Sequence, residues 1–234
     1  MATLTPIQRL MDRPAYAAVY EWLVHPLFLL LFTRRFRFES IYRELRRLRE
    51  PASGPAERLV LDVACGTGWF GRRVLRDAGA NLRVIGVDTS PSMLDQAGRR
   101  RDRLGIPRHR LSLLQADAQD MGPIADASVD ELWLCGALHL IPRPERTLSE
   151  VARVLKPGAA LLCQTFVASN SRVARRMYRR LSGRSGFEFF ADAELRELLR
   201  SNGLALVGER RSGSVLFFAA ERNGMEGTSI ASLS

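Results

Sequence analysis

The chain has 234 residues, of which 46% are hydrophobic and 26% are charged, and this balance is typical of a globular protein with a sizeable core. Its formal net charge is +10, but Lys156 is the only lysine among 35 basic residues, so we interpret the charge as an arginine-rich solvated surface, with an anionic partner as the alternative. Three scattered cysteines and three scattered histidines show no metal-ligand spacing, which argues against a metal site and against a disulfide-stapled fold.

The longest apolar stretch, residues 22–32, contains His25 and Pro26 and falls short of the ~20 residues that a membrane-spanning helix needs. Arginines follow it where a signal peptide would have small residues at its cleavage site. We therefore expect a cytoplasmic protein, with peripheral contact to an anionic membrane as an alternative.

The N-terminal region, residues 1–55, is expected to form a helical cap and linker. Helices are expected over 15–32 and 39–49, and the prolines and glycine of 51–55 end the second one.

Residues 56–222 are expected to form the main domain, because strand and helix patterns alternate along it. Alternation of this kind predicts an α/β fold, a Rossmann-like doubly wound sheet that is mostly parallel. The expected strands cover 59–63, 82–87, 110–115, 129–135 and 159–167, and the expected helices cover 69–78, 92–103 and 145–155.

The last part of the chain differs from this alternation. Residues 168–190 read as a basic amphipathic insertion with six arginines between 172 and 184. A helix over 192–201 and strands over 204–210 and 214–221 predict a C-terminal antiparallel hairpin. Residues 223–234 are small and polar, and we expect them to be disordered.

A glycine-rich turn follows the first expected strand, in the sequence LVLDVACGTGWFG at 59–71. Gly66 and Gly68 permit a sharp turn and close approach of a ligand to the backbone. With Gly71 they also fit the dinucleotide fingerprint, so a nicotinamide cofactor is the competing interpretation. Asp62 opposes that interpretation, because a carboxylate ahead of the loop repels a pyrophosphate and attracts a cationic ligand.

Four segments, LDVACGTG, VIGVDTSPSML, QADA and ARVLKPG, occur in an order and spacing that resemble the class I S-adenosylmethionine-dependent methyltransferases. The likeness is to the small-molecule branch that includes ubiquinone and menaquinone methyltransferases, and it covers about 59–166. It implies S-adenosylmethionine as the cofactor. Ala64 and Ala159 depart from the commoner pattern, and alanine at 64 still permits the turn.

The resemblance assigns cofactor contacts to the ends of successive strands. Asp62 would contact the amino group of the cofactor, and the glycine turn would contact its methionine part. Asp88 would accept hydrogen bonds from both ribose hydroxyls. Met93 would make an apolar contact with the adenine ring, or else belong to the core. Asp117 would accept a hydrogen bond from the exocyclic amine of the adenine, or else only form a turn. The full set of expected cofactor residues is Asp62, Ala64, Gly66, Gly68, Asp88, Thr89, Met93, Asp117, Ala118 and Cys135.

The acceptor side of the site is less defined. His139 is the candidate general base for an acceptor that must lose a proton, with a packing role as the alternative. Tyr16 and Tyr20 share a helix face and are candidates to cap the acceptor pocket, although core packing explains them equally well.

The expected activity is in-line transfer of a methyl group to O, C or N of a small, rather apolar acceptor, mainly by positioning. One alternative is a methyltransferase of a quinone or lipid at the membrane surface. It is suggested by the apolar stretch 22–32, by the arginines that follow this stretch and by the arginines between 172 and 184. A second is an RNA-binding methyltransferase, which is less favoured because no RNA-binding module is recognisable.

Overall fold

The computed structural model describes residues 6–19, 38–50, 57–77, 81–168 and 189–224. A single seven-stranded sheet, in the order β3-β2-β1-β4-β5-β7-β6, runs through the domain. The first five strands are parallel, whereas β7 is antiparallel to both of its neighbours. The strands are β1 (Arg58–Val63), β2 (Leu82–Asp88), β3 (Leu111–Gln115), β4 (Val129–Cys135), β5 (Leu155–Phe166), β6 (Leu204–Ser212) and β7 (Val215–Arg222).

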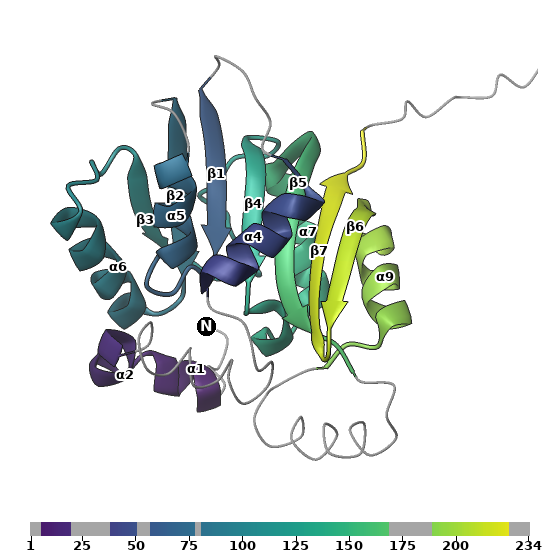
Figure 1. Cartoon of the computed structure of the whole chain (residues 1–234), viewed down its shortest axis with the longest axis horizontal. Helices are drawn as coiled ribbons and strands as arrows, with labels where there is room; N and C mark the ends of the chain where they lie inside the picture. The colour runs from purple at the N-terminus through teal and green to yellow at the C-terminus, as the bar shows by residue number, and fades with distance from the viewer. Residues whose placement is uncertain (1–5, 20–37, 51–56, 78–80, 169–188, 225–234) are drawn as a thin grey trace, which may run out of the picture.

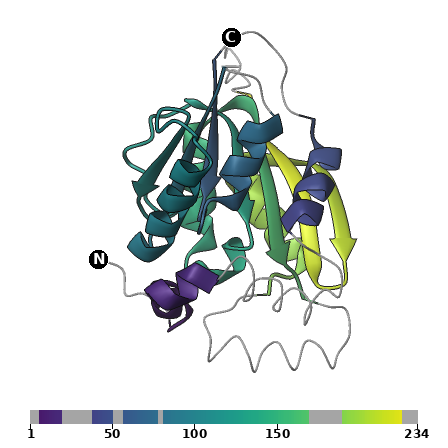
Figure 2. The ribbon, with the colours of Figure 1, turned by 60° about the vertical axis from the view of Figure 1, so that its left-hand side comes forward.

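Helices cover both faces of the sheet. The helices are α1 (Pro6–Met11), α2 (Pro14–Val19), α4 (Phe38–Leu48), α5 (Trp69–Asp77), α6 (Pro91–Arg103), α7 (Pro144–Val154) and α9 (Asp192–Ser201), with a 3-10 turn η2 (Leu138–Leu140). Figure 1 shows α4 and α5 in front of the sheet and α7 behind it. Both Figure 1 and Figure 2 place α1 and α2 beside the carboxyl ends of the parallel strands.

The central strand β4 shows how the two faces are filled. Leu132 and Leu134 point into the core under α7 and α9, whereas Trp133 points into the core under α4 and α5. All three are fully buried. Because successive strand residues face opposite sides, a strand covered on both faces is expected to be largely apolar, and five of the seven β4 residues are.

Two acidic residues of β4, Asp130 and Glu131, are the exceptions, and Glu131 is the buried one. Glu131 is 2% exposed, and its carboxylate accepts from Arg46 of α4 at 2.7 Å and from Trp133 Nε1 at 2.6 Å. The Arg46 guanidinium also lies over the Trp133 ring at 4.8 Å, and Tyr42 stacks on the same ring with centroids 5.2 Å apart. This buried cluster fastens α4 to the middle of the sheet.

The predicted fold class is confirmed: the domain is α/β with a doubly wound, mostly parallel sheet, a C-terminal antiparallel hairpin and N-terminal helices. The strand expected over 159–167 begins four residues earlier, because β5 follows directly after α7 without a loop. The hairpin strands also extend further than expected, to Ser212 and Arg222.

Several expectations concern residues that the structure does not describe. The linker 51–55, Tyr20, most of the expected helix 15–32, most of the basic insertion 168–190 and the tail from 225 onward lie outside the described residues. The domain limits at 1–55, 56–222 and 223–234 therefore stay predictions. Within the described ranges, no helix combines the length and the apolar character that crossing a bilayer requires.

Candidate functional site

A cleft opens at the carboxyl ends of the parallel strands, where β1 and β4 lie side by side and the strand order reverses. In doubly wound sheets, ligands bind at this switch point. The loops after β1, β2, β3 and β4 all contribute to it. The lining residues are Ala64, Gly66, Asp88, Thr89, Ser90, Met93, Ala116, Asp117, Ala118, Cys135, Gly136, Ala137, Leu140 and Ile141.

The turn after β1 is held in left-handed backbone conformations. The φ angles are 52° at Ala64, 53° at Gly66 and 75° at Gly68. A Cβ on Gly68 would lie 3.2 Å from that of Ala97 in α6, so glycine also allows α6 to pack closely there. The left-handed conformation of Ala64 costs about 1–2 kcal/mol, because its Cβ lies close to the following carbonyl oxygen. The turn therefore tolerates alanine at its entry and depends on glycine where it meets α6.

Asp88, at the end of β2, ties two backbone segments together. Its carboxylate accepts from the amide of Gly66 at 2.7 Å and from the amide of Ser90 at 2.9 Å. Burial raises the pKa of Asp88, while these hydrogen bonds act in the opposite direction. Asp88 thus shapes the glycine turn as well as presenting a carboxylate to the cleft.

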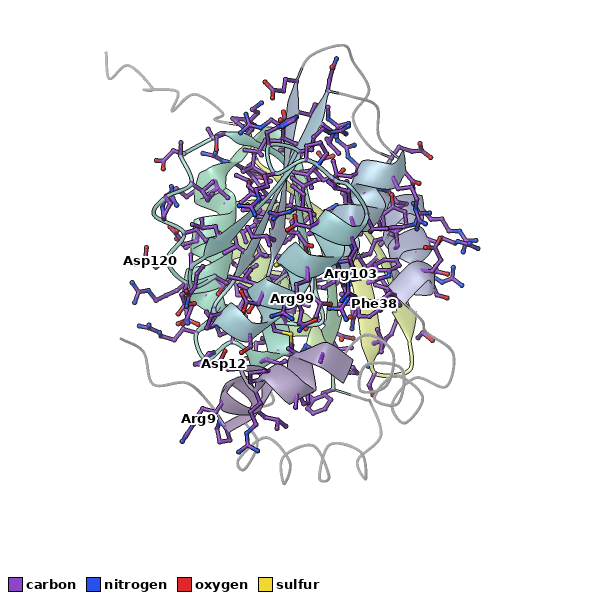
Figure 3. The ribbon with its side chains drawn as sticks, turned by 90° about the vertical axis from the view of Figure 1, so that its left-hand side faces the viewer. Arg9, Asp12, Phe38, Arg99, Arg103 and Asp120 are labelled. Carbon is purple, nitrogen blue, oxygen red and sulfur yellow. The ribbon has the colours of Figure 1, made fainter. Side chains whose placement is uncertain are left out.

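Ser90 caps the N-terminus of α6, as its position before Pro91 suggests. Its hydroxyl oxygen accepts from the amide of Met93 at 3.2 Å, and the same hydroxyl donates to Asp12 Oδ1 at 2.8 Å. Figure 3 shows Asp12 where the α1–α2 segment meets the start of α6. The N-terminal helices therefore contact the rim of the cleft through this hydrogen bond.

Asp62 lies behind the glycine turn and is 2% exposed. Its carboxylate accepts from the amide of Gly71 at 2.9 Å and so caps the first turn of α5. Burial raises the pKa of Asp62 to about 7, and the neighbouring Asp88 carboxylate adds to the rise. The described residues place Asp62 near the cleft without making it part of the lining.

Asp117 follows β3 and belongs to a hydrogen-bonded chain. Gln119 donates from its backbone amide to Asp117 Oδ1 at 2.9 Å and from its side-chain amide to both carboxylate oxygens. Arg143 Nε in turn donates to Gln119 Oε1 at 3.1 Å. Sequence reasoning did not single out Gln119, because a glutamine two residues after a turn aspartate carries no distinctive signal.

The turn after β4 forms the other wall of the cleft. Cys135 lines it, and burial raises the pKa of the Cys135 thiol well above its ordinary value. Leu140 and Ile141 add apolar surface. Among the described residues, no group of three carboxylate, thiol or imidazole side chains is placed to hold a metal ion.

His139 does not belong to the cleft lining. It is 1% exposed, its ring meets that of Phe166 edge-on at 4.7 Å, and its Nδ1 lies 3.4 Å from Thr165 Oγ1. Burial lowers the pKa of His139 to about 3. The imidazole is therefore neutral near pH 7 and packed beneath the cleft, which favours the packing interpretation over a role as base.

Of the two tyrosines expected at the acceptor pocket, only Tyr16 is described. It lies on α2, where burial raises the pKa of its hydroxyl, and it is not among the residues lining the cleft.

The residues expected to bind the cofactor lie in one cleft or directly behind it. The structure brings Ala64, Gly66, Asp88, Thr89, Met93, Asp117, Ala118 and Cys135 into one cleft lining, with Gly68 and Asp62 just behind it.

Residues 61–163 match the family model described as a methyltransferase domain. The demethylmenaquinone methyltransferase of Symbiobacterium thermophilum is 38% identical over 116 residues, which cover 50% of this chain and 45% of that protein. The chain spans about half the length of the first curated relatives that it matches.

Two solved structures share the fold. A SAM-dependent methyltransferase from Aquifex aeolicus has a TM-score of 0.66 at 18% identity, covering 90% of this chain and 98% of that one. Geranyl diphosphate C-methyltransferase from Streptomyces coelicolor A3(2), determined in complex with Mg²⁺, geranyl diphosphate and S-adenosyl-L-homocysteine, has a TM-score of 0.66 at 18% identity. The match covers 79% of this chain and 77% of that one.

Proposed function

Because this chain belongs to the class I S-adenosylmethionine-dependent methyltransferase superfamily, we propose that it transfers a methyl group from S-adenosylmethionine to a small, rather apolar acceptor. The observation that carries the proposal is the pair of carboxylates, Asp88 and Asp117, that enter one cleft from the ends of adjacent strands.

The lining of the cleft suits this cofactor. Asp88 offers the acceptor oxygens that a ribose diol needs, and Asp117 offers a carboxylate to an adenine amine. Met93, Ala118 and Ile141 supply apolar surface for the purine ring. Asp62 lies behind the glycine turn as the carboxylate available to the cationic amino-acid end, directly or through water. The groups present therefore fit a nucleoside that is joined through a positively charged sulfur to an amino acid.

The bound cofactor supplies an activated methyl group on sulfur with a good leaving group. The task left to the protein is alignment of the acceptor and exclusion of water, which can contribute ~7–11 kcal/mol. The wall formed by Gly136, Ala137, Leu140 and Ile141 carries no charged side chain. This wall favours an acceptor with an apolar body, and the likeness to a demethylmenaquinone methyltransferase makes quinone-like and phenolic compounds the first to screen.

Isothermal titration calorimetry with S-adenosylhomocysteine, and with NAD as the competitor, tests the proposal. We expect S-adenosylhomocysteine to bind with one site per chain and NAD not to bind. The Asp88→Asn variant should bind S-adenosylhomocysteine roughly 10- to 100-fold more weakly, because a neutral amide replaces a charged acceptor worth about 1.5–3 kcal/mol. Asp95→Asn, an exposed change on α6, is the matched control. Binding of NAD instead would overturn the proposal.

A further inference from the structure

A buried glutamine, Gln164, lies near the end of β5 on a face of the sheet that is apolar around it. It is 2% exposed and pairs in register with Cys135 of β4 and with Phe217 of β7. Figure 1 shows β5 between these two strands. Leu162 and Phe166, two positions away on β5, share this face and belong to the core under α4 and α5. Gln164 therefore places a polar amide among apolar side chains.

The fold does not account for this amide. The Nε2 atom of Gln164 is buried and has no hydrogen-bond partner among the described residues. Most buried polar atoms in proteins are paired, because leaving one unpaired costs its full desolvation free energy. A methionine or leucine would fill the same space without that cost. A ligand that forms a hydrogen bond with the amide would explain why a glutamine stands here.

The amide of Gln164 lies beside the cleft at the strand ends. Gly136 lines that cleft, and its backbone amide donates to the backbone carbonyl of Gln164 at 2.9 Å. A Cβ on Gly136 would lie 3.5 Å from Gln164 Oε1, with no other atom of the described residues within 4 Å except in its two chain neighbours. The φ angle of Gly136 is 72°, which favours glycine at this position. The missing side chain therefore leaves a gap through which a ligand in the cleft can approach the amide.

The proposed position of the cofactor leaves this side of the cleft to the acceptor. In the proposed function the adenine lies at Asp117 after β3, the ribose lies at Asp88 of β2, and the amino-acid end lies at the turn after β1. The strand order β3-β2-β1-β4-β5 then leaves the ends of β4 and β5 beside the reactive methyl group. Gly136 follows β4 and Gln164 belongs to β5, so both lie on the acceptor side.

We propose that the side-chain amide of Gln164 forms a hydrogen bond with a hydroxyl group of the acceptor. This contact selects, among apolar acceptors, those that carry a hydroxyl group near the atom that receives the methyl group. The inference rests on the proposed function and narrows its class of acceptor. A hydroxyl group both donates and accepts, so it pairs with the carbonyl edge or the NH2 edge of the amide.

Binding of two probes, 1-naphthol and 1-methylnaphthalene, to the full chain saturated with S-adenosylhomocysteine tests the proposal. The probes share a naphthalene body, and a methyl group replaces the hydroxyl group in the second. Gln164→Met removes the amide at similar side-chain length, and Gln164→Leu removes it in a second way. Thr165→Val is the matched control, because Thr165 is also buried on β5 and its hydroxyl lies 3.4 Å from His139 on the opposite face. Equilibrium dialysis measures each affinity.

We expect 1-naphthol to bind to the wild-type protein. The ratio of the 1-naphthol affinity to the 1-methylnaphthalene affinity should fall about 3- to 10-fold in both Gln164 variants, as expected for the loss of one hydrogen bond. Thr165→Val should change this ratio less than about twofold, because it lies outside the contact. Absence of 1-naphthol binding, an unchanged ratio in the Gln164 variants or an equal fall in the control would each overturn the proposal.

Urea unfolding distinguishes this role from a structural one. Gln164→Met should unfold at the same urea concentration as the wild type or at a higher one, because it removes an unpaired buried atom. Unfolding at a lower concentration would show that the fold uses the amide, and would overturn the proposal.

The affinity for S-adenosylhomocysteine is measured on the same samples. Absence of S-adenosylhomocysteine binding in the wild type would contradict the proposed methyltransferase function. Normal S-adenosylhomocysteine binding with an unchanged probe ratio in the Gln164 variants would contradict only the role of Gln164. The two failures are therefore seen in separate measurements.

Discussion

The side-chain amide of Gln119 donates to both carboxylate oxygens of Asp117, at 3.1 Å each. This contact fixes the plane of a carboxylate that lines the cleft, and Arg143 fixes the amide in turn. Gln119 is 7% exposed, so water does not easily take its place. It is therefore a positioning residue for Asp117.

Replacing Gln119 by leucine should weaken S-adenosylhomocysteine binding about 3- to 10-fold, because a carboxylate that is no longer held in place loses part of the about 1.5–3 kcal/mol that a hydrogen bond to a charged group contributes. Discrimination against S-inosylhomocysteine should shrink as well, since the purine 6-position is what Asp117 is proposed to read. Calorimetry with both ligands measures this, with Gln96→Leu on α6 as the control. Equal weakening for both ligands would indicate general loosening of the cleft.

Asp62 should make cofactor binding depend on pH. With a pKa of about 7, it is mostly protonated at pH 6 and mostly ionised at pH 8. Only the ionised form attracts an ammonium group, so S-adenosylhomocysteine should bind about tenfold more tightly at pH 8 than at pH 6. Asp62→Asn should bind weakly and with little pH dependence. A wild-type affinity that does not change over this range would contradict the role proposed for Asp62.

His139 should reduce stability in acid. Its pKa is about 3 when folded and 6.5 in the reference state, so the unfolded chain binds the extra proton between these values, and stability falls as the pH drops below 6.5. At pH 5 the loss is roughly 2 kcal/mol relative to pH 8. Urea unfolding of wild type and His139→Leu at both pH values measures it.

The His139→Leu variant should lack this part of the loss of stability between pH 8 and pH 5. The contributions of the carboxylates that both proteins share, Asp62 included, cancel when the two proteins are compared. Methyl-transfer turnover offers a second reading. If His139→Leu alone removed a pH-dependent step between pH 6 and 9, the imidazole would be acting as a base after all.

The buried pair of Arg46 and Glu131 should be costly to break. Arg46→Met leaves the Glu131 carboxylate, which is 3% exposed as a side chain, without its cation, and we expect a loss of about 3–5 kcal/mol in the free energy of unfolding. Arg47→Met on the same helix removes a pair whose arginine side chain is 65% exposed, so it should cost under about 1 kcal/mol.

Adding Glu131→Gln to Arg46→Met should restore part of the stability, since an amide needs no counter-charge. If the two arginine variants unfolded at the same urea concentration, the proposed anchoring of α4 by Arg46 would be wrong.

The strand ends and the residues that follow them could be predicted from the sequence because they depend on local signals. Apolar runs mark the strands. The glycine turn follows β1, Asp88 ends β2, and the Ser90–Pro91 cap follows β2 by one residue. The contact between Arg46 and Glu131 joins residues 85 positions apart, so no local sequence pattern predicts it. For the same reason the sequence left open whether His139 faces the cleft or the core, because one turn of η2 decides it.

The topology also has a consequence for synthesis on the ribosome. β7 lies between β5 and β6, although it is the last strand to be translated. Eight successive residues of β5, Ala159 to Phe166, are buried in the finished sheet. Until Val215–Arg222 emerges, β5 presents an unpaired apolar edge, which is a template for misassociation. The nascent chain must therefore protect this edge, by delayed collapse or by a chaperone, until β7 has been made.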